Sequence, residues 1–150
     1  MRALCFALLL CLGAPALALQ PDVPHAVVAS QATRIVVGEV TTLEPRFVAG
    51  GDGYIETGVF ISTDRSLRGS GADLELVIEG GRIGELATGS SDAPKVELDG
   101  RYIFLLVEDF EGRWRVLGGQ RGAIALRSPT HPRAKTLTQV AATLEVPVVD

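Results

Sequence analysis

The chain has 150 residues and a formal net charge of −4, and 47% of its residues are hydrophobic. That length is enough for one domain with its own hydrophobic core. The mild acidity argues against a nucleic-acid partner or an anionic membrane surface, and the 17 glycines favour strands and turns over helices.

The first 18 residues have the layout of a cleavable signal peptide. Arg2 precedes an apolar run over residues 3–12, and Ala16-Leu17-Ala18 has the small-x-small pattern of a signal peptidase site. The run is shorter than the roughly twenty residues that a membrane span needs. We therefore expect cleavage after Ala18, no stable membrane insertion afterwards, and an exported product in the periplasm or outside the cell.

Cleavage would change the chemistry of the mature chain. Both cysteines, Cys5 and Cys11, lie in the signal segment, so the mature chain is expected to have no disulfide and no thiolate metal site. Arg2 is the only charged residue of this segment, and its removal would bring the net charge to −5.

The mature chain is predicted to begin with a flexible lead-in over residues 19–32 and to continue as short strands. Alternating or continuous apolar residues predict the strands over 33–43, 54–64, 73–79, 102–107, 113–117 and 123–126. In the first strand the alternation shifts across Gly38, which is typical of a β-bulge. The segment 102–107 is apolar on both faces and indicates a central strand, whereas 80–100 is interpreted as an irregular stretch.

Consecutive short strands with hairpin-length turns predict a mainly β fold, namely a small five- to six-stranded antiparallel OB-like barrel over residues 33–127. Residues 128–150 are predicted to form a linker and a short C-terminal helix over about 136–145. Thr136 and Gln139 fit a capping box at its start. Its apolar stripe recurs at helical spacing through Leu137, Val140 and Leu144.

Several strand segments carry a family resemblance. They are RIVVGEVTTLEPRFV, YIETGVFISTD, DLELVIEGG, VELDGRYIFLLVED and RWRVLGGQRGAIAL, all between Thr33 and Leu126. Together they resemble small exported bacterial proteins with an OB-like barrel, which are distantly similar to the netrin-like domain of tissue inhibitors of metalloproteinases. The resemblance implies a closed five-stranded sheet. Those inhibitors bind the zinc of their target through an N-terminal cysteine, and the predicted mature chain has none, so only the fold carries over.

No motif in the chain predicts catalysis, a metal site or a cofactor. The only histidines, His25 and His131, fall in the lead-in and the linker, whereas a zinc site needs three or four converging ligands. Ser70 lies in a turn without a Gly-x-Ser-x-Gly motif. The glycines of 80–84 match neither a dinucleotide-binding nor a P-loop spacing. We therefore expect a protein that is not an enzyme and binds no cofactor.

The acidic residues of the third predicted strand have a structural interpretation. Glu75 and Glu79 point outward, and in an OB-like barrel this strand neighbours the one that carries Arg113 and Arg115. The four side chains are predicted to form a cross-strand charge ladder on the surface.

One surface suggests a binding function. Tyr54 and Phe60 project from the second strand opposite its inward set, and this face of an OB-like barrel is a usual binding surface. The predicted partner face is Tyr54, Glu56, Phe60, Glu75 and Val77, an apolar patch with an acidic rim. The alternative is that the C-terminal helix covers Phe60 with its apolar stripe.

These observations predict an exported, non-catalytic binding module that recognises another envelope or secreted protein. A second hypothesis is a protease-inhibitor-like regulator that acts through the loop over 82–92, and a third, less favoured, is a hydrolase. The sequence leaves the oligomeric state open.

Overall fold

The computed structural model describes residues 23–50 and 52–147. The predicted signal peptide and its cleavage site lie outside the described residues. In the described part of the chain, no helix is long and apolar enough to cross a membrane.

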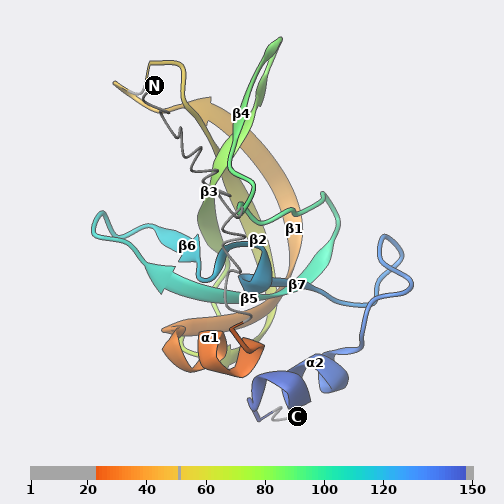
Figure 1. Cartoon of the computed structure of the whole chain (residues 1–150). Helices are drawn as coiled ribbons and strands as arrows, with labels where there is room; N and C mark the ends of the chain where they lie inside the picture. Colours follow the sequence, from red (N-terminus) through yellow and green to blue (C-terminus); the bar gives the residue numbers. More distant parts are fainter. Residues whose placement is uncertain (1–22, 51, 148–150) are drawn as a thin grey trace, which may run out of the picture.

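The fold is mainly β, as predicted, and its centre is a closed five-stranded barrel (Figure 1). The elements in chain order are α1 (His25–Gln31), β1 (Arg34–Phe47), β2 (Ile55–Arg68), β3 (Leu74–Ile83), β4 (Leu86–Gly89), β5 (Arg101–Glu108), β6 (Trp114–Val116), the 3-10 helix η1 (Gly119–Gly122), β7 (Ala123–Ala125) and α2 (Leu137–Leu144). Around the barrel the strands follow the order β1, β2, β3, β6 and β5, and β5 pairs with β1 to close it. Only the β3–β6 pair is parallel among these, which is consistent with an OB-like barrel.

Two apolar clusters stabilise the molecule, one inside the barrel and one between the barrel and the helices. Strand β5 belongs to both. Its Phe104 and Leu106 point into the barrel, and its Ile103 and Leu105 pack in the helix-side cluster. The prediction of a central strand that is buried on both faces is therefore confirmed.

The inward faces of β2 and β3 are also confirmed. The side chains of Val59 and Ile61 on β2, and of Leu76 and Ile78 on β3, are buried in the barrel cluster. Because successive residues of a strand point to opposite sides, the residues between them face outward. This alternation places the candidate site described below on the outside of the barrel.

The prediction of a flexible lead-in is wrong for its described part, because residues 25–31 form helix α1. Val28 and Ala29 are buried in the helix-side cluster. The Arg68 guanidinium donates hydrogen bonds to the carbonyl oxygens of Ala29 (2.6 Å) and Ala32 (2.8 Å) at the end of the helix. A helix of seven residues is not stable alone, and these tertiary contacts supply what its local sequence does not show.

The C-terminal helix and its capping box are confirmed. The Thr136 Oγ1 accepts from the Gln139 N–H, and the Gln139 side chain accepts from the Thr136 N–H. The apolar stripe of α2 packs in the helix-side cluster, where α2 lies against α1 at the end of the barrel opposite β4 (Figure 1). The alternative in which this helix covers Phe60 is therefore wrong.

A register shift occurs at Gly38, as predicted, but its extra residue lies on the partner strand. Between Val37 and Gly38 of β1, Asp64 is the extra residue of β2, while the β1–β5 register stays regular through Gly38. The apparent change of phase arises because β1 is buried on both faces here. A Cβ atom on Gly38 would lie 2.7 Å from the Ser62 carbonyl oxygen, so the glycine permits a close approach of β2.

The irregular stretch predicted over 80–100 contains regular structure. Strand β3 continues to Ile83 and pairs with β4, so that the first part of this stretch is a β-hairpin. Gly80 and Gly81 have φ values of 96° and 155°, a region that favours glycine, at the point where the hairpin leaves the barrel. The predicted flexible loop over 82–92 is thus mostly strand and turn.

Candidate functional site

The pairing of β2 with β3 brings four residues of the predicted partner face together on the outside of the barrel. Phe60 pairs with Glu75, Gly58 with Val77, and Glu56 with Glu79. Tyr54 immediately precedes β2, and the negative charges of Glu79 and Glu56 both act on the pKa of its hydroxyl. Burial, followed by the charge of Glu79, raises the pKa of Tyr54 above its ordinary value.

The face is nevertheless not the apolar patch that the sequence predicts. Val77 is only 4% exposed and Glu56 only 9%, Phe60 and Glu75 are half-buried, and Tyr54 is 38% exposed. Val77 lines a cavity of about 210 Å³ that is also bordered by Arg115 of β6 and by the segment 90–94. Alternation along a strand therefore identified the outward direction but not the exposure.

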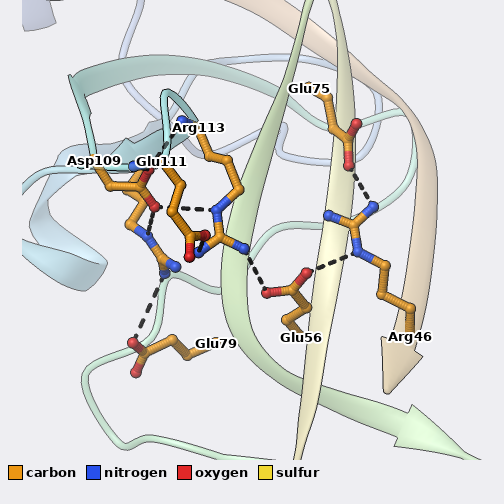
Figure 2. A network of polar contacts seen from close by, with 8 residues as sticks. Arg46, Glu56, Glu75, Glu79, Asp109, Glu111 and Arg113 are labelled. Atoms are coloured by element: carbon orange, nitrogen blue, oxygen red, sulfur yellow. Dashed lines mark hydrogen bonds and ion pairs between the residues drawn. The ribbon is translucent and has the colours of Figure 1, made fainter. Parts of the chain in front are cut away.

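A continuous network of ion pairs occupies this face instead (Figure 2). Glu56 is at its centre: one carboxylate oxygen lies 2.8 Å from the Arg46 Nε, and the other lies 3.3 Å from the Arg113 Nη1. Arg46 also reaches Glu75 at 2.9 Å. Through Glu56, the side chains of β1, β2, β3 and β6 are joined in one arrangement.

Asp109, at the start of the β5–β6 turn, is the second centre of this network (Figure 2). One of its oxygens accepts from the Arg115 Nε at 2.8 Å and from the Arg113 Nε at 3.2 Å. Its other oxygen accepts from the backbone N–H groups of Glu111 and Arg113, both at 2.9 Å. The hydrogen bond from Arg115, with those from the backbone, holds the pKa of Asp109 well below its usual range.

The predicted charge ladder is confirmed in one pair and wrong in the other. Arg115 lies 3.8 Å from Glu79, as predicted. Glu75 pairs with Arg46 of β1, whereas Arg113 contacts Glu56, Asp109 and Glu111. The strand order alone does not predict this exchange, because Arg46 comes from the far end of a long, curved β1.

The most exposed large apolar residue of the described chain is Phe110, which is absent from the predicted partner face. It is 96% exposed in the β5–β6 turn, between Asp109 and Glu111. The turn is closed by a hydrogen bond from the Gly112 N–H to the Asp109 carbonyl oxygen (3.0 Å), and Gly112 adopts a φ of 75°. An aromatic residue in a turn between acidic residues is a signal that sequence reasoning could have used, because such positions normally hold polar side chains.

Arg34 is a buried charge outside this network. Its guanidinium donates to the backbone carbonyl oxygens of Ser70 (2.8 Å) and Ala72, and lies 5.3 Å from the centre of the Trp114 ring. Burial lowers the pKa of Arg34 from its ordinary value. These contacts attach the β2–β3 connection to β1 and β6, which is a structural role.

The remaining residues weighed from the sequence do not gather into a site. His25 begins α1, and His131 lies 3.6 Å from Glu97 and edge-on to the Tyr102 ring. The Ser70 hydroxyl accepts from the Ala72 N–H within its own turn. Within residues 23–50 and 52–147, no group of three or more histidine, cysteine, aspartate or glutamate side chains is placed to hold a metal ion.

The fold and the site define a small closed β-barrel whose outer face carries a fixed ion network next to an exposed aromatic turn. Comparison of the chain with protein-family models, with curated proteins and with solved structures gave no match in any of the three.

Proposed function

We propose that the chain is an exported, non-catalytic binding module that recognises another envelope or secreted protein. The contact surface would consist of the outer face of β2, β3 and β6 and the adjoining β5–β6 turn. The single observation that carries this proposal is Phe110, a fully exposed aromatic side chain on a turn that is fixed at both ends.

Aromatic side chains, phenylalanine included, are enriched at protein–protein interfaces relative to the rest of a protein surface. Binding is favoured further when such a residue is already held in place, because less conformational entropy is lost on association. The Asp109 carboxylate supplies this order by accepting from two backbone N–H groups of the turn and from two arginines of β6 and its approach.

The export part of the proposal rests on the signal-like first 18 residues. The protease-inhibitor alternative relied on a flexible loop over 82–92, and most of that segment is the β3–β4 hairpin. No described contact of that hairpin favours protease inhibition over binding in general.

Site-specific photocrosslinking tests the proposal. A photoreactive phenylalanine analogue would replace Phe110 in the full chain expressed in its own cells, and the matched control would carry the analogue at Leu98. Leu98 is also exposed, at 51%, but lies outside the network and the turn. We expect a discrete crosslinked protein from position 110 only, which binds again when both proteins are purified.

Phe110→Ser should abolish that reconstituted binding without changing the midpoint of unfolding, since the side chain has almost no contacts to lose. Equal crosslinking from both positions, or no adduct from position 110, would contradict the proposal.

A further inference from the structure

We infer that the β5–β6 turn and the neighbouring carboxylates form a docking surface for a basic segment of the partner, in which lysine or arginine alternates with apolar residues. This inference rests on the proposed function and deepens it, because it names the chemistry of the partner.

The aromatic ring is the anchor of this surface. Phe110 offers almost its whole side chain to solvent, and the closure of its turn fixes the backbone from which the ring projects. An aromatic face attracts the cationic heads of lysine and arginine, and its edge packs against aliphatic side chains. A segment in which basic and aliphatic residues alternate therefore makes favourable contacts with the ring in more than one register.

The charges beside the ring favour a cationic partner. The network contains five carboxylates and three guanidinium groups. The two most exposed of these side chains are acidic, since Glu79 is 58% exposed and Glu111 49%. The three guanidinium groups are less exposed, at 43% for Arg46, 32% for Arg113 and 29% for Arg115. Glu108, exposed at the end of β5, adds a further negative charge. An approaching segment thus meets an excess of negative charge, which selects for basic residues and accelerates their association.

Other occupants fit this surface less well. The C-terminal helix of the chain itself packs against α1 in the helix-side cluster. A second copy would bring the same acidic face, or another part of a chain with a net charge of −4, toward these carboxylates. A nucleic acid would place its phosphates against the same carboxylates.

Two synthetic peptides test the inference with the purified chain. One alternates lysine with leucine, and its matched control has glutamate in place of every lysine. Binding is followed by NMR titration, so that chemical-shift changes report both the affinity and the residues contacted. We expect the lysine peptide to bind at residues 108–113, to bind more weakly as salt is added, and to bind more tightly than the glutamate peptide.

Two variants assign the binding to this surface. Phe110→Ser should weaken the lysine peptide about tenfold, the factor that corresponds to losing one moderate interface anchor. Glu79→Gln should weaken it by a smaller factor and reduce its salt dependence. Their controls are Leu98→Ser and Glu145→Gln, which alter an exposed apolar residue and an exposed carboxylate elsewhere and should leave binding unchanged. Each variant is first shown to keep the unfolding midpoint of the original chain.

The inference is overturned if the glutamate peptide binds this surface as tightly as the lysine peptide, or if neither peptide shows binding that depends on Phe110. Either result rejects the basic partner segment but does not test the proposed binding function, which the crosslinking experiment tests separately. A crosslinked partner that contacts position 110 through an acidic segment would retain the proposed function and reject the inference.

Discussion

Glu56 shows how a single residue joins the outer face of the barrel. Its carboxylate is almost inaccessible to solvent and bridges Arg46 to Arg113, which come from β1 and from the approach to β6. A carboxylate in such a position is stabilised only while both guanidinium groups remain. Its outward position on β2 is that of an ordinary surface residue, and only its two arginine partners distinguish it from one.

Replacing Glu56 with alanine should therefore lower the free energy of unfolding by about 1–2 kcal/mol, because two arginines lose their shared partner. The value is reduced from that of a fully buried pair since both arginines are partly exposed. Glu75→Ala is the matched control and should cost at most about 1 kcal/mol, as at a surface pair. Urea denaturation measures both variants, and equal losses would contradict a central role for Glu56.

The ionisation of Asp109 has a consequence for stability at low pH. Its folded-state pKa lies below that of an unfolded aspartate, which is about 3.9. The ionised carboxylate therefore stabilises the fold above about pH 4, and this contribution is lost as the pH falls through the folded pKa.

The expected outcome is that Asp109→Asn destabilises the chain at neutral pH and that the difference from the original chain narrows below about pH 4. Urea denaturation at a series of pH values measures this difference. Glu111→Gln serves as the control on the same turn, since Glu111 is half-exposed and, among the described residues, forms an ion pair with Arg113 alone. A difference that stays constant down to pH 3 would refute the role assigned to the ionised carboxylate.

At the scale of elements, the bend that separates the β3–β4 hairpin from the barrel depends on glycine. A Cβ atom at Gly81 would lie 2.6 Å from the Thr57 Oγ1 and 2.9 Å from the Ile55 Cγ2, and its φ of 155° favours glycine. On the paired strand β4, a Cβ atom added to Gly89 would have open space around it. The two glycines therefore form a matched pair within one hairpin.

Gly81→Ala should lower the free energy of unfolding by about 1–3 kcal/mol through steric overlap and backbone strain. Gly89→Ala should change it by no more than about 0.5 kcal/mol. Thermal or urea denaturation distinguishes the two variants. Similar values would show that the hairpin shifts freely to accommodate the added methyl group.

Strand and helix patterns were predictable where they depend on neighbours in the sequence. The inward residues of β2 and β3 follow from strict alternation, and the start of α2 follows from Thr136 and Gln139, three residues apart. Helix α1 was missed because seven residues show too little periodicity, and its order comes from Arg68 and the helix-side cluster. The β3–β4 hairpin was missed because its glycines are typical of irregular loops as well as of tight bends.

At the scale of the whole molecule, the barrel and the helices are expected to unfold as one unit, because β5 contributes to both apolar clusters. Adjacent residues of α1 test this: Val28 is buried against the barrel, and Val27 is exposed. Val28→Ala should lower the free energy of unfolding by about 1–2 kcal/mol, and Val27→Ala by less than about 0.5 kcal/mol.

The fluorescence of Trp114, the only tryptophan of the chain, reports on the barrel, and far-ultraviolet circular dichroism reports on secondary structure throughout. The two signals should give the same midpoint for Val28→Ala, as in a two-state transition. A shifted circular dichroism midpoint with an unshifted fluorescence midpoint would show that the helices detach from the barrel independently.

In the candidate site, contacts between adjacent strands were predictable from the sequence and contacts between distant segments were not. Glu79 and Arg115 were correctly paired because adjacent strands limit the choice of partners. The pairing of Glu75 with Arg46, and the burial of Val77 and Glu56, depend on segments that are distant in sequence and were predicted incorrectly. Phe110 was overlooked because a single apolar residue in a turn carries no periodic signal.

The sequence by itself determined the mainly β class, the inward sets of β2 and β3, the double burial of β5 and the capped C-terminal helix, since each follows from local spacing and side-chain chemistry. Only the tertiary structure decided that α1 is ordered, that α2 packs on α1 instead of on Phe60, and which outward residues remain exposed. The physical reason is that exposure and ion pairing depend on which distant segments meet, and the long, curved strands of a closed barrel bring together side chains whose separation in sequence gives no indication of contact.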